Sequence, residues 1–452
     1  MPESFSITSS WIQNKIFWLL LIVPLCFKIE ILPSVIIMPQ EVILPILIGL
    51  YFLAKGKFNT KMSIISMPYI YLLMALILTL ILTVFSLFYS FDLVGLLKII
   101  KYSIYVIAII IISNYTPTNF IKILNKITIT TIVLTLIIFY LNKIESGKIW
   151  ATYVAMATYV SSYMPTGFSN RVLNLQSGSF VIYSGNHGIY GSYLALILFF
   201  NFSSILRSKR KNFLGLLTII LCFINLMLLT SRETFLLIFI TIFTYSFYYV
   251  SYKKFNPSKL VSVFILFVLF LLLIIWAVNY FDIELSIINK VENSIRKFRE
   301  EGGDGSVDVR LNTWLLILIF LFTNPLRVIF GTGFNPTLFR EKIDFVASQN
   351  PDIGKYVGIP ESLFLQFLSY GGIVSLFFIF LFFYSLYKNV WKVKNISVNG
   401  MFIPFFLLGL FVTNNTGASI LAELLMTQFA LVYVFIMNDN INEYEKNSFS
   451  NC

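Results

Sequence analysis

Three arginines fall in polar segments between long apolar runs. Arg171 precedes one such run, Arg232 stands beside Glu233 in a short polar break, and Arg310 lies in the longest polar stretch of the chain. A guanidinium stays charged and offers paired donors that match phosphate oxygens. Three arginines on one face of a membrane predict an anion site, such as one for a diphosphate. The alternative is that each arginine reaches lipid headgroups or pairs locally, as Arg232 could with Glu233.

Glu361 and His187 are the candidate acid–base groups. Glu361 opens an apolar run, where a helix dipole would keep its carboxylate charged. It could equally serve as a base or as an electrostatic partner of the arginines. His187 is the only histidine and follows Asn186 near the outer part of another apolar run. An ionisable group inside a span supports a functional hypothesis, although a single histidine is more often a packed, hydrogen-bonded side chain.

Two lysines stand three residues apart within an apolar run. Lys98 and Lys101 would share one face of a helix. Two buried ammonium groups are costly without an anionic partner. They predict a site for a lipid phosphate, unless the helix enters the membrane later and leaves both lysines at an interface. The sequence does not choose between these two interpretations.

The composition indicates which elements must position these residues. The 452-residue chain is 58% hydrophobic and 12% charged, whereas an ordinary soluble domain is about 25% charged. Apolar runs of about 20 residues recur throughout, each long enough to cross a bilayer. We therefore expect one all-α polytopic membrane domain over residues 1–452. The expected spans, about twelve, are 15–31, 35–54, 64–89, 92–113, 121–141, 178–201, 213–230, 233–251, 259–280, 362–387, 400–414 and 419–437.

The net charge of +12 comes largely from lysines and arginines in short loops, which is the pattern of cytoplasmic loops and not of nucleic-acid binding. This bias predicts that both termini are cytoplasmic and that segments 142–177 and 281–361 lie outside. The basic residues that set the orientation are Lys55, Lys57, Lys61, Arg207, Lys209, Arg210, Lys211, Lys253, Lys254, Lys259, Lys388, Lys392 and Lys394.

The large external loop, 281–361, is expected to carry short interfacial helices. The stretch 314–322 is apolar but too short to span. We expect a helix there that opens at Asn312 or Thr313 and stops at Asn324-Pro325. The loop also places Trp314 as an anchoring aromatic near Arg310. The glycines at 302–305 indicate a mobile hinge, and those at 331–333 a flexible turn.

Several kinds of chemistry find no support in the sequence. There is no glycine-rich nucleotide motif, and Cys26, Cys222 and Cys452 show no disulfide or metal spacing. The first fourteen residues lack a small-residue cleavage site, so no removable signal peptide is expected. We expect no cofactor and no metal. The short connection 207–212 differs from the long central loop of twelve-span carriers and disfavours a transporter.

The chain resembles the O-antigen polymerase and ligase superfamily of bacterial envelope enzymes over about residues 165–385. The resemblance implies a helical membrane bundle with a large external loop capping a cavity. Ligases of the superfamily usually carry a histidine–asparagine pair where this chain has Glu361-Ser362, and this difference resembles the polymerase branch. The residues that carry the resemblance are Arg171 through Gly178, Asn186, Ser231-Arg232, Arg310, Trp314, Asn324-Pro325-Leu326, Gly331-Thr332-Gly333-Phe334, Pro360-Glu361-Ser362 and Gly371-Gly372-Ile373.

The resemblance implies a glycosyltransferase that joins polyprenyl-diphosphate-linked repeat units of an O-antigen, capsule or exopolysaccharide outside the cytoplasmic membrane. Arg232 and Arg310 with Glu361 would act in catalysis, and Arg171, His187, Asn186, Trp314, Lys98 and Lys101 would bind substrate. The partners implied are an undecaprenyl-diphosphate-linked donor and acceptor, the bilayer and a chain-length regulator. A ligase that moves finished glycan to another acceptor, or a flippase for lipid-linked oligosaccharide, are the alternatives.

Overall fold

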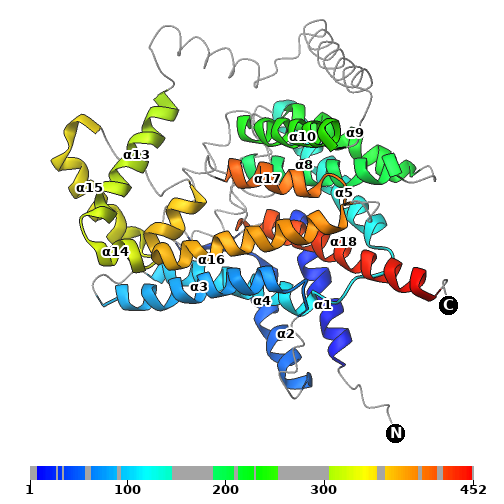
Figure 1. Ribbon diagram of the computed structural model, residues 1–452, viewed down its shortest axis with the longest axis horizontal. Helices are drawn as coiled ribbons and strands as arrows, with labels where there is room; N and C mark the ends of the chain where they lie inside the picture. Colours follow the sequence, from blue (N-terminus) through cyan, green and yellow to red (C-terminus); the bar gives the residue numbers. More distant parts are fainter. Residues whose placement is uncertain are drawn as a thin grey trace, which may run out of the picture.

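The computed structural model describes residues 8–26, 29–32, 35–55, 63–88, 93–144, 187–207, 212–228, 231–252, 305–353, 362–394, 400–414 and 421–449. Regular structure in these ranges is helical apart from one pair of short strands (Figure 1). The α-helices are α1 (Ser9–Leu21), α2 (Pro39–Lys55), α3 (Met67–Ser86), α4 (Leu93–Ile112), α5 (Phe120–Ile144), α8 (His187–Arg207), α9 (Phe213–Leu228), α10 (Arg232–Tyr252), α13 (Gly305–Phe322), α14 (Pro325–Phe330), α15 (Pro336–Gln349), α16 (Leu363–Val393), α17 (Ile403–Thr413) and α18 (Glu423–Phe449), and the 3-10 turns are η1 (Val23–Leu25) and η3 (Pro351–Ile353).

The described residues confirm a helical fold, and one short strand pair replaces predicted helix near the start of the chain. Strands β1 (Ile29–Leu32) and β2 (Val35–Ile37) pair antiparallel. The predicted spans 15–31 and 35–54 are therefore wrong in extent, since α1 ends at Leu21 and α2 begins at Pro39. Pro24 lies in the 3-10 turn that follows α1, and β-branched residues favour the strands. A hydropathy window counts apolar residues alike, whichever backbone they adopt.

Several helices have the length and composition of membrane spans. Among the residues that the structure describes, five helices are long and apolar enough to cross a bilayer: Met67–Ser86, Leu93–Ile112, Phe120–Ile137, Gly188–Leu206 and Leu363–Val393. Shorter apolar helices cover Phe213–Leu226, Glu233–Tyr249, Arg310–Phe322 and Ile403–Thr413. The predicted span 259–280 lies outside the described residues, so the number twelve stays a prediction.

Contacts made along helix α4 show which segments lie at each end of the bundle. Near its start, a side chain at Gly95 would collide with the backbone oxygen of Phe334, in the connection between α14 and α15. Two turns further along, Lys101 is ion-paired with Glu423, the first residue of α18. The segment α13–α15 and the beginning of α18 therefore lie toward the same end of α4.

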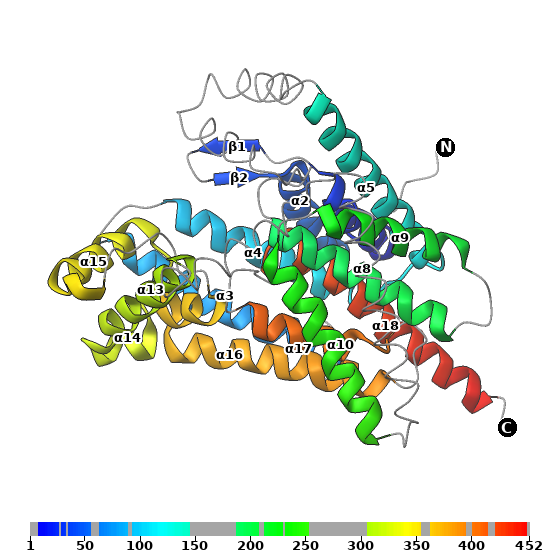
Figure 2. The same ribbon diagram turned by 90° about the horizontal axis from the view of Figure 1, so that it is seen from above.

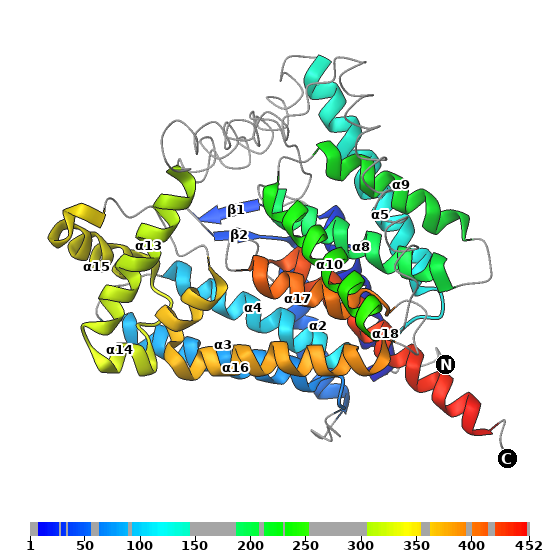
Figure 3. The ribbon, with the colours of Figure 1, turned by 45° about the horizontal axis from the view of Figure 1, so that its top comes forward.

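The other end of α4 meets the terminal helices. Gln13 of α1 donates to the carbonyl oxygen of Ile111 (2.8 Å), and Asn438 of α18 donates to that of Ser113 (3.2 Å). About 27 Å separates Gly95 from Ser113 at the usual helical rise. The beginning of α1 and the end of α18 thus lie away from α13–α15 (Figures 1, 2 and 3). This matches the relative placement expected from the charge bias, and which face is cytoplasmic stays a prediction.

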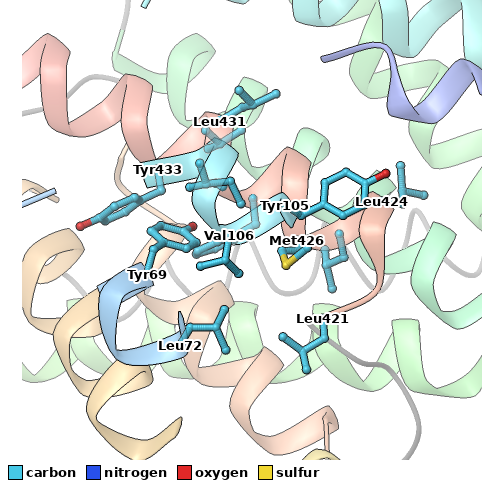
Figure 4. Packing of buried hydrophobic residues seen from close by; sticks show 14 of the residues in the cluster. Tyr69, Leu72, Tyr105, Val106, Leu421, Leu424, Met426, Leu431 and Tyr433 are labelled. Atoms are coloured by element: carbon cyan, nitrogen blue, oxygen red, sulfur yellow. The ribbon is translucent and has the colours of Figure 1, made fainter. Parts of the chain in front are cut away.

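The bundle interior is aromatic and sparsely polar. In Figure 4, Tyr69 of α3 and Tyr433 of α18 lie close together, with Tyr105 of α4 further along the same cluster. The two rings are 6.0 Å apart between centroids, and Asn389 of α16 donates to the Tyr433 hydroxyl at 2.8 Å. These contacts join α3, α16 and α18, three helices from distant parts of the sequence, into one packed body.

Large apolar side chains also cover much of the outside. Phe88 is 82% exposed, Phe213 76% and Phe247 68%. Apolar surface on this scale would be unfavourable in water, whereas lipid tails are as apolar as the side chains themselves. The exposed faces therefore fit a protein embedded in a bilayer.

Candidate functional site

The first turns of α8 and α10 meet directly. The Thr234 hydroxyl donates to the carbonyl oxygen of Gly188 at 3.5 Å and to the Ser231 hydroxyl at 2.9 Å. A Cβ at Gly191 would collide with the Thr234 side chain, so glycine is what permits the approach. His187 opens α8 and Arg232 opens α10. Two candidate residues 45 positions apart therefore begin helices that start side by side, although their side chains lie outside the described part.

Arg310 joins these helix ends from α13. Its Nη2 lies 3.4 Å from Glu233 Oε1, and the two side chains are 34% and 22% exposed. The sequence offered Arg232 as a partner for Glu233, and the structure gives Glu233 a partner from a segment 77 residues away. Glu233 is thus a functional candidate that sequence reasoning treated only as a local counter-charge. Its position beside Arg232 in a short polar break was the available signal.

The start of α16 lies at the same end of the bundle. Ser362 is 2% exposed and accepts a hydrogen bond from the Leu365 amide at 3.4 Å. The Leu363 amide donates to the carbonyl oxygen of Asn414, directly after α17, at 3.0 Å. Glu361, the residue before Ser362, lies outside the described residues.

Helix α17 relates that end to α10. Tyr245, in the second half of α10, donates to the sulfur of Met401 just before α17 at 3.5 Å. Gly409 near the end of α17 meets Leu237 near the start of α10. The two helices therefore run antiparallel, and the end of α17 lies level with the first turns of α10 (Figure 2). The N-termini of α8, α10 and α16 thus share one end of the molecule.

Electrostatically, this end suits an anion. Each helix N-terminus presents backbone N–H groups without intrahelical partners and about half a positive charge. Arg232 and Arg310 add two full charges, against the carboxylate of Glu233. Helix N-termini combined with arginine are a frequent setting for phosphate recognition.

Helix α13 starts earlier than the sequence predicted. The expected opening at Asn312 or Thr313 is wrong, because the helix begins at Gly305 and continues to Phe322. The predicted stop is confirmed: Asn324 caps α14 by accepting from the Leu326 amide at 3.0 Å. Polar residues before Asn312 were taken as loop, yet they form the first turns of the helix, ahead of its apolar part. Arg310 therefore sits on a helix, one turn from the half-buried Trp314 and on the same side of it.

The turn 331–333, expected to be flexible, is held firmly. Gly331 and Gly333 both adopt φ of +75°, a conformation that glycine allows without strain. The amides of Thr332 and Gly333 donate to the carbonyl oxygens of Ser369 and Tyr370, each at 2.9 Å. The turn therefore completes the backbone hydrogen bonding of α16 where that helix is interrupted.

The interruption in α16 lies at Gly372, whose φ is +66°. A Cβ there would collide with the carbonyl oxygen of Ile329 in α14. Tyr370, just before it, packs its ring edge-on against Phe334 and Phe339, with centroids 4.5 and 5.2 Å away. These contacts fix α14 and α15 on the bundle. Helix α13, which carries Arg310, packs on α15 through Phe320 and Phe339, whose ring centroids are 5.8 Å apart.

Lys101 has anionic partners that the sequence did not reveal. Its Nζ lies 2.5 Å from Glu423 Oε1 and 3.8 Å from Glu41 Oε1. Tyr105 donates to Glu41 at 3.0 Å, and the amide of Met38 donates to the same carboxylate at 3.0 Å. The lysine side chain is 15% exposed and the carboxylates 6% and 7%. Lys98 is half-buried. Binding of substrate by either lysine stays a prediction.

Three of the predicted site residues, Arg171, Asn186 and Glu361, lie outside the part of the chain that the structure describes. Among the residues that the structure describes, no group of three or more histidine, cysteine, aspartate or glutamate side chains could hold a metal ion. The structure thus brings Arg310 to the helix ends that begin with His187 and Arg232.

The fold and composition define a helical integral membrane protein. The family described as O-antigen ligase matches residues 217–380, from α9 into α16, and this range contains Arg232, Glu233 and Arg310. The match confirms the resemblance to the O-antigen ligase and polymerase superfamily, whose members transfer glycans. No curated protein matches the chain in sequence. The apolar helices and the family match point to the bacterial inner membrane.

Proposed function

We propose that this protein polymerises polyprenyl-diphosphate-linked oligosaccharide repeat units on the outer face of the cytoplasmic membrane. The observation that carries the proposal is the convergence of Arg310 of α13 with the first turns of α8 and α10. A donor diphosphate placed there would meet two arginines and two helix N-termini. Its polyprenyl tail would remain in the bilayer, beside the exposed apolar faces of the helices.

The reaction follows from where the charge develops. A hydroxyl of the acceptor repeat unit attacks the anomeric carbon of the donor sugar, and the bond from that carbon to the phosphate oxygen breaks. The leaving polyprenyl diphosphate takes the bonding electron pair, so negative charge grows on its oxygen. Arg232 and Arg310 stabilise that charge in the transition state. The donor is already activated, so this step itself requires no nucleotide.

Glu361 is the proposed acceptor of the hydroxyl proton. It directly precedes Ser362, which caps α16 at the same end of the bundle as Arg310. The positive end of a helix favours an ionised carboxylate, and an ionised carboxylate can take or orient a hydroxyl proton. If Glu361 has this role, Glu361→Gln reduces turnover about 10²-fold or more. If it only stabilises the helix end, the change costs about 0.3–1 kcal/mol and leaves turnover intact.

A ligase activity is the second candidate, because the matching family is described as O-antigen ligase. The same donor site would then serve a finished glycan and a different acceptor. Glu361-Ser362 in place of the histidine–asparagine pair supports the polymerase.

Purified protein in vesicles, supplied with lipid-linked repeat units, separates these functions. A polymerase produces a ladder of lengthening glycan, and a ligase produces a single conjugate only when its acceptor is added. Movement of substrate across the bilayer without any new glycosidic bond would contradict both and indicate a flippase. Arg232→Lys, which keeps the charge but loses the paired donors, should abolish most of the ladder at unchanged protein level.

The outward orientation has its own test. Ser348 is exposed on α15, so Ser348→Cys in a Cys452→Ser background offers a single accessible thiol on that segment. A membrane-impermeant maleimide should label it in intact cells. Labelling that requires prior membrane disruption would place α15 in the cytoplasm and contradict an extracytoplasmic reaction.

A further inference from the structure

The ion pair between Glu233 and Arg310 is weak enough to separate when another anion binds Arg310. The contact between Arg310 Nη2 and Glu233 Oε1 measures 3.4 Å, longer than the 2.7–2.9 Å of a strong charge-assisted hydrogen bond, and about a third of the arginine side chain is exposed. Ion pairs with this exposure contribute little to stability. The contact with Glu233 therefore orients Arg310 without binding it strongly.

The side chain of Arg310 can move further than that of Glu233. Glu233 is in the first turn of α10, whose neighbour Thr234 is buried and hydrogen-bonded to Ser231 and Gly188. The backbone of Glu233 is thus fixed against α8. Arg310 has a long side chain with several rotatable bonds on α13, so it is the partner that can turn toward another anion.

A diphosphate is a better partner for Arg310 than Glu233 is. It carries more negative charge, and its oxygens accept two parallel hydrogen bonds from one guanidinium. The N-termini of α8 and α10 lie beside the pair and would hold such an anion as well.

We propose that Glu233 is a positioning residue that holds Arg310 toward the donor site between turnovers and releases it when a diphosphate binds. This inference rests on the proposed function, because it assigns a second role within the same site. Competition from Glu233 opposes binding of the donor diphosphate. It equally assists release of the polyprenyl diphosphate product, which carries the same group.

Glu233→Gln tests the inference, because the amide oxygen can still accept a hydrogen bond from Arg310 while the competing charge is lost. We expect the KM for the lipid-linked donor and the inhibition constant of undecaprenyl diphosphate to fall together, about 2- to 5-fold. The kcat falls as product leaves more slowly. A merely structural role would change protein level or raise KM, and would not tighten both ligands.

Asp344→Asn is the matched control. It removes the carboxylate of another arginine–carboxylate ion pair, Arg340–Asp344 on α15, in the α13–α15 segment that also carries Arg310. The two side chains are 74% and 55% exposed. If loss of any nearby negative charge were sufficient, this variant would tighten binding as well, and that result would overturn the specific role of Glu233. Glu233→Asp, which keeps the charge but reaches less far, should shift KM in the same direction by a smaller factor.

Two results separate the inference from the function on which it rests. Undecaprenyl diphosphate binding is measured first on the wild-type protein, without acceptor. Failure of the wild type to bind it would overturn the diphosphate site and the inference with it. Wild-type binding with an unchanged or raised KM in Glu233→Gln would overturn the inference alone and leave the diphosphate site standing.

Discussion

Two groups of charged residues lie toward the same end of the bundle and differ in burial and in the distance between their charged atoms. Lys101, Glu41 and Glu423 join α2, α4 and α18, and their side chains are at most 15% exposed. Arg310 and Glu233 join α13 to α10 and are 34% and 22% exposed. Lys101 Nζ lies 2.5 Å from Glu423 Oε1 in the first group, whereas Arg310 Nη2 lies 3.4 Å from Glu233 Oε1 in the second.

Burial explains the difference in role that we assign. A buried ion loses its hydration, so each member of the Lys101 group depends on the others. Glu41 and Glu423 stand in the first turns of their helices, where the helix dipole adds support. Arg310 keeps access to solvent and can exchange one anion for another at little cost. An accessible pair of the second kind suits a ligand site, and a buried group of the first kind suits a structural role.

The largest effect should come from removing the cation of the buried group. Lys101→Met leaves two carboxylates without their lysine, and breaking a buried pair in this way typically costs about 3–5 kcal/mol. We expect much less protein in the membrane and a lower unfolding temperature in detergent. Lys126→Met, at an exposed position on α5, is the control and should leave both measurements unchanged.

Restoring charge balance sharpens that test. Combining Lys101→Met with Glu41→Gln and Glu423→Gln should recover much of the lost stability, because a neutral buried group avoids the desolvation penalty. No recovery would mean that packing, and not charge, accounts for the loss in the single variant.

The next effect should be on activity alone. Arg310→Lys keeps the positive charge but not the planar paired donors, so we expect glycan transfer to fall about 10²-fold while the unfolding temperature changes little. Transfer per unit of membrane-inserted protein is the measurement. A variant with near-normal transfer would return Arg310 to a structural role and remove the contrast between the two groups.

The smallest effect should be that of the half-exposed pair on stability. Glu233→Gln is expected to change the free energy of unfolding by about 0.2–1 kcal/mol, since solvent screens such pairs. Unfolding in detergent at low and high salt checks this value. A loss as large as that expected for Lys101→Met would show that the pair is structural, and would contradict a contact that opens during turnover.

The predictions made from the sequence were correct where a local signal was strong. Asn324-Pro325 ends α13 because proline cannot continue a helix and asparagine caps the next one. The start of the same helix was missed, since charged residues before Asn312 suggested a loop. At the other extreme, apolar residues over 22–37 suggested membrane helices, whereas part of this stretch forms the strand pair.

In the candidate site, residue types were likewise predicted from the sequence and their contacts were not. Arg232 and Arg310 were chosen because arginine between apolar runs suits a phosphate. Arg310, in the second turn of α13, contacts Glu233 in the first turn of α10, the helix that Arg232 opens. Local pairing with Arg232 was one alternative for Glu233, and it stays a prediction because the side chain of Arg232 lies outside the described part. The contacts of Glu233 with Arg310, and of Lys101 with Glu41 and Glu423, were not predicted, because they depend on three-dimensional proximity.

By itself the sequence determined that this chain forms apolar helices of membrane length, because a backbone in lipid must satisfy its hydrogen bonds within the helix. It also determined the stop at Asn324-Pro325, whereas the interruptions at Pro24 and Gly372 were not predicted. Only the tertiary structure decided which charges meet. Glu423 reaches Lys101, and Glu233 reaches Arg310, because packing brings distant helices together. Side-chain pairing follows that packing, and no local pattern in the sequence records it.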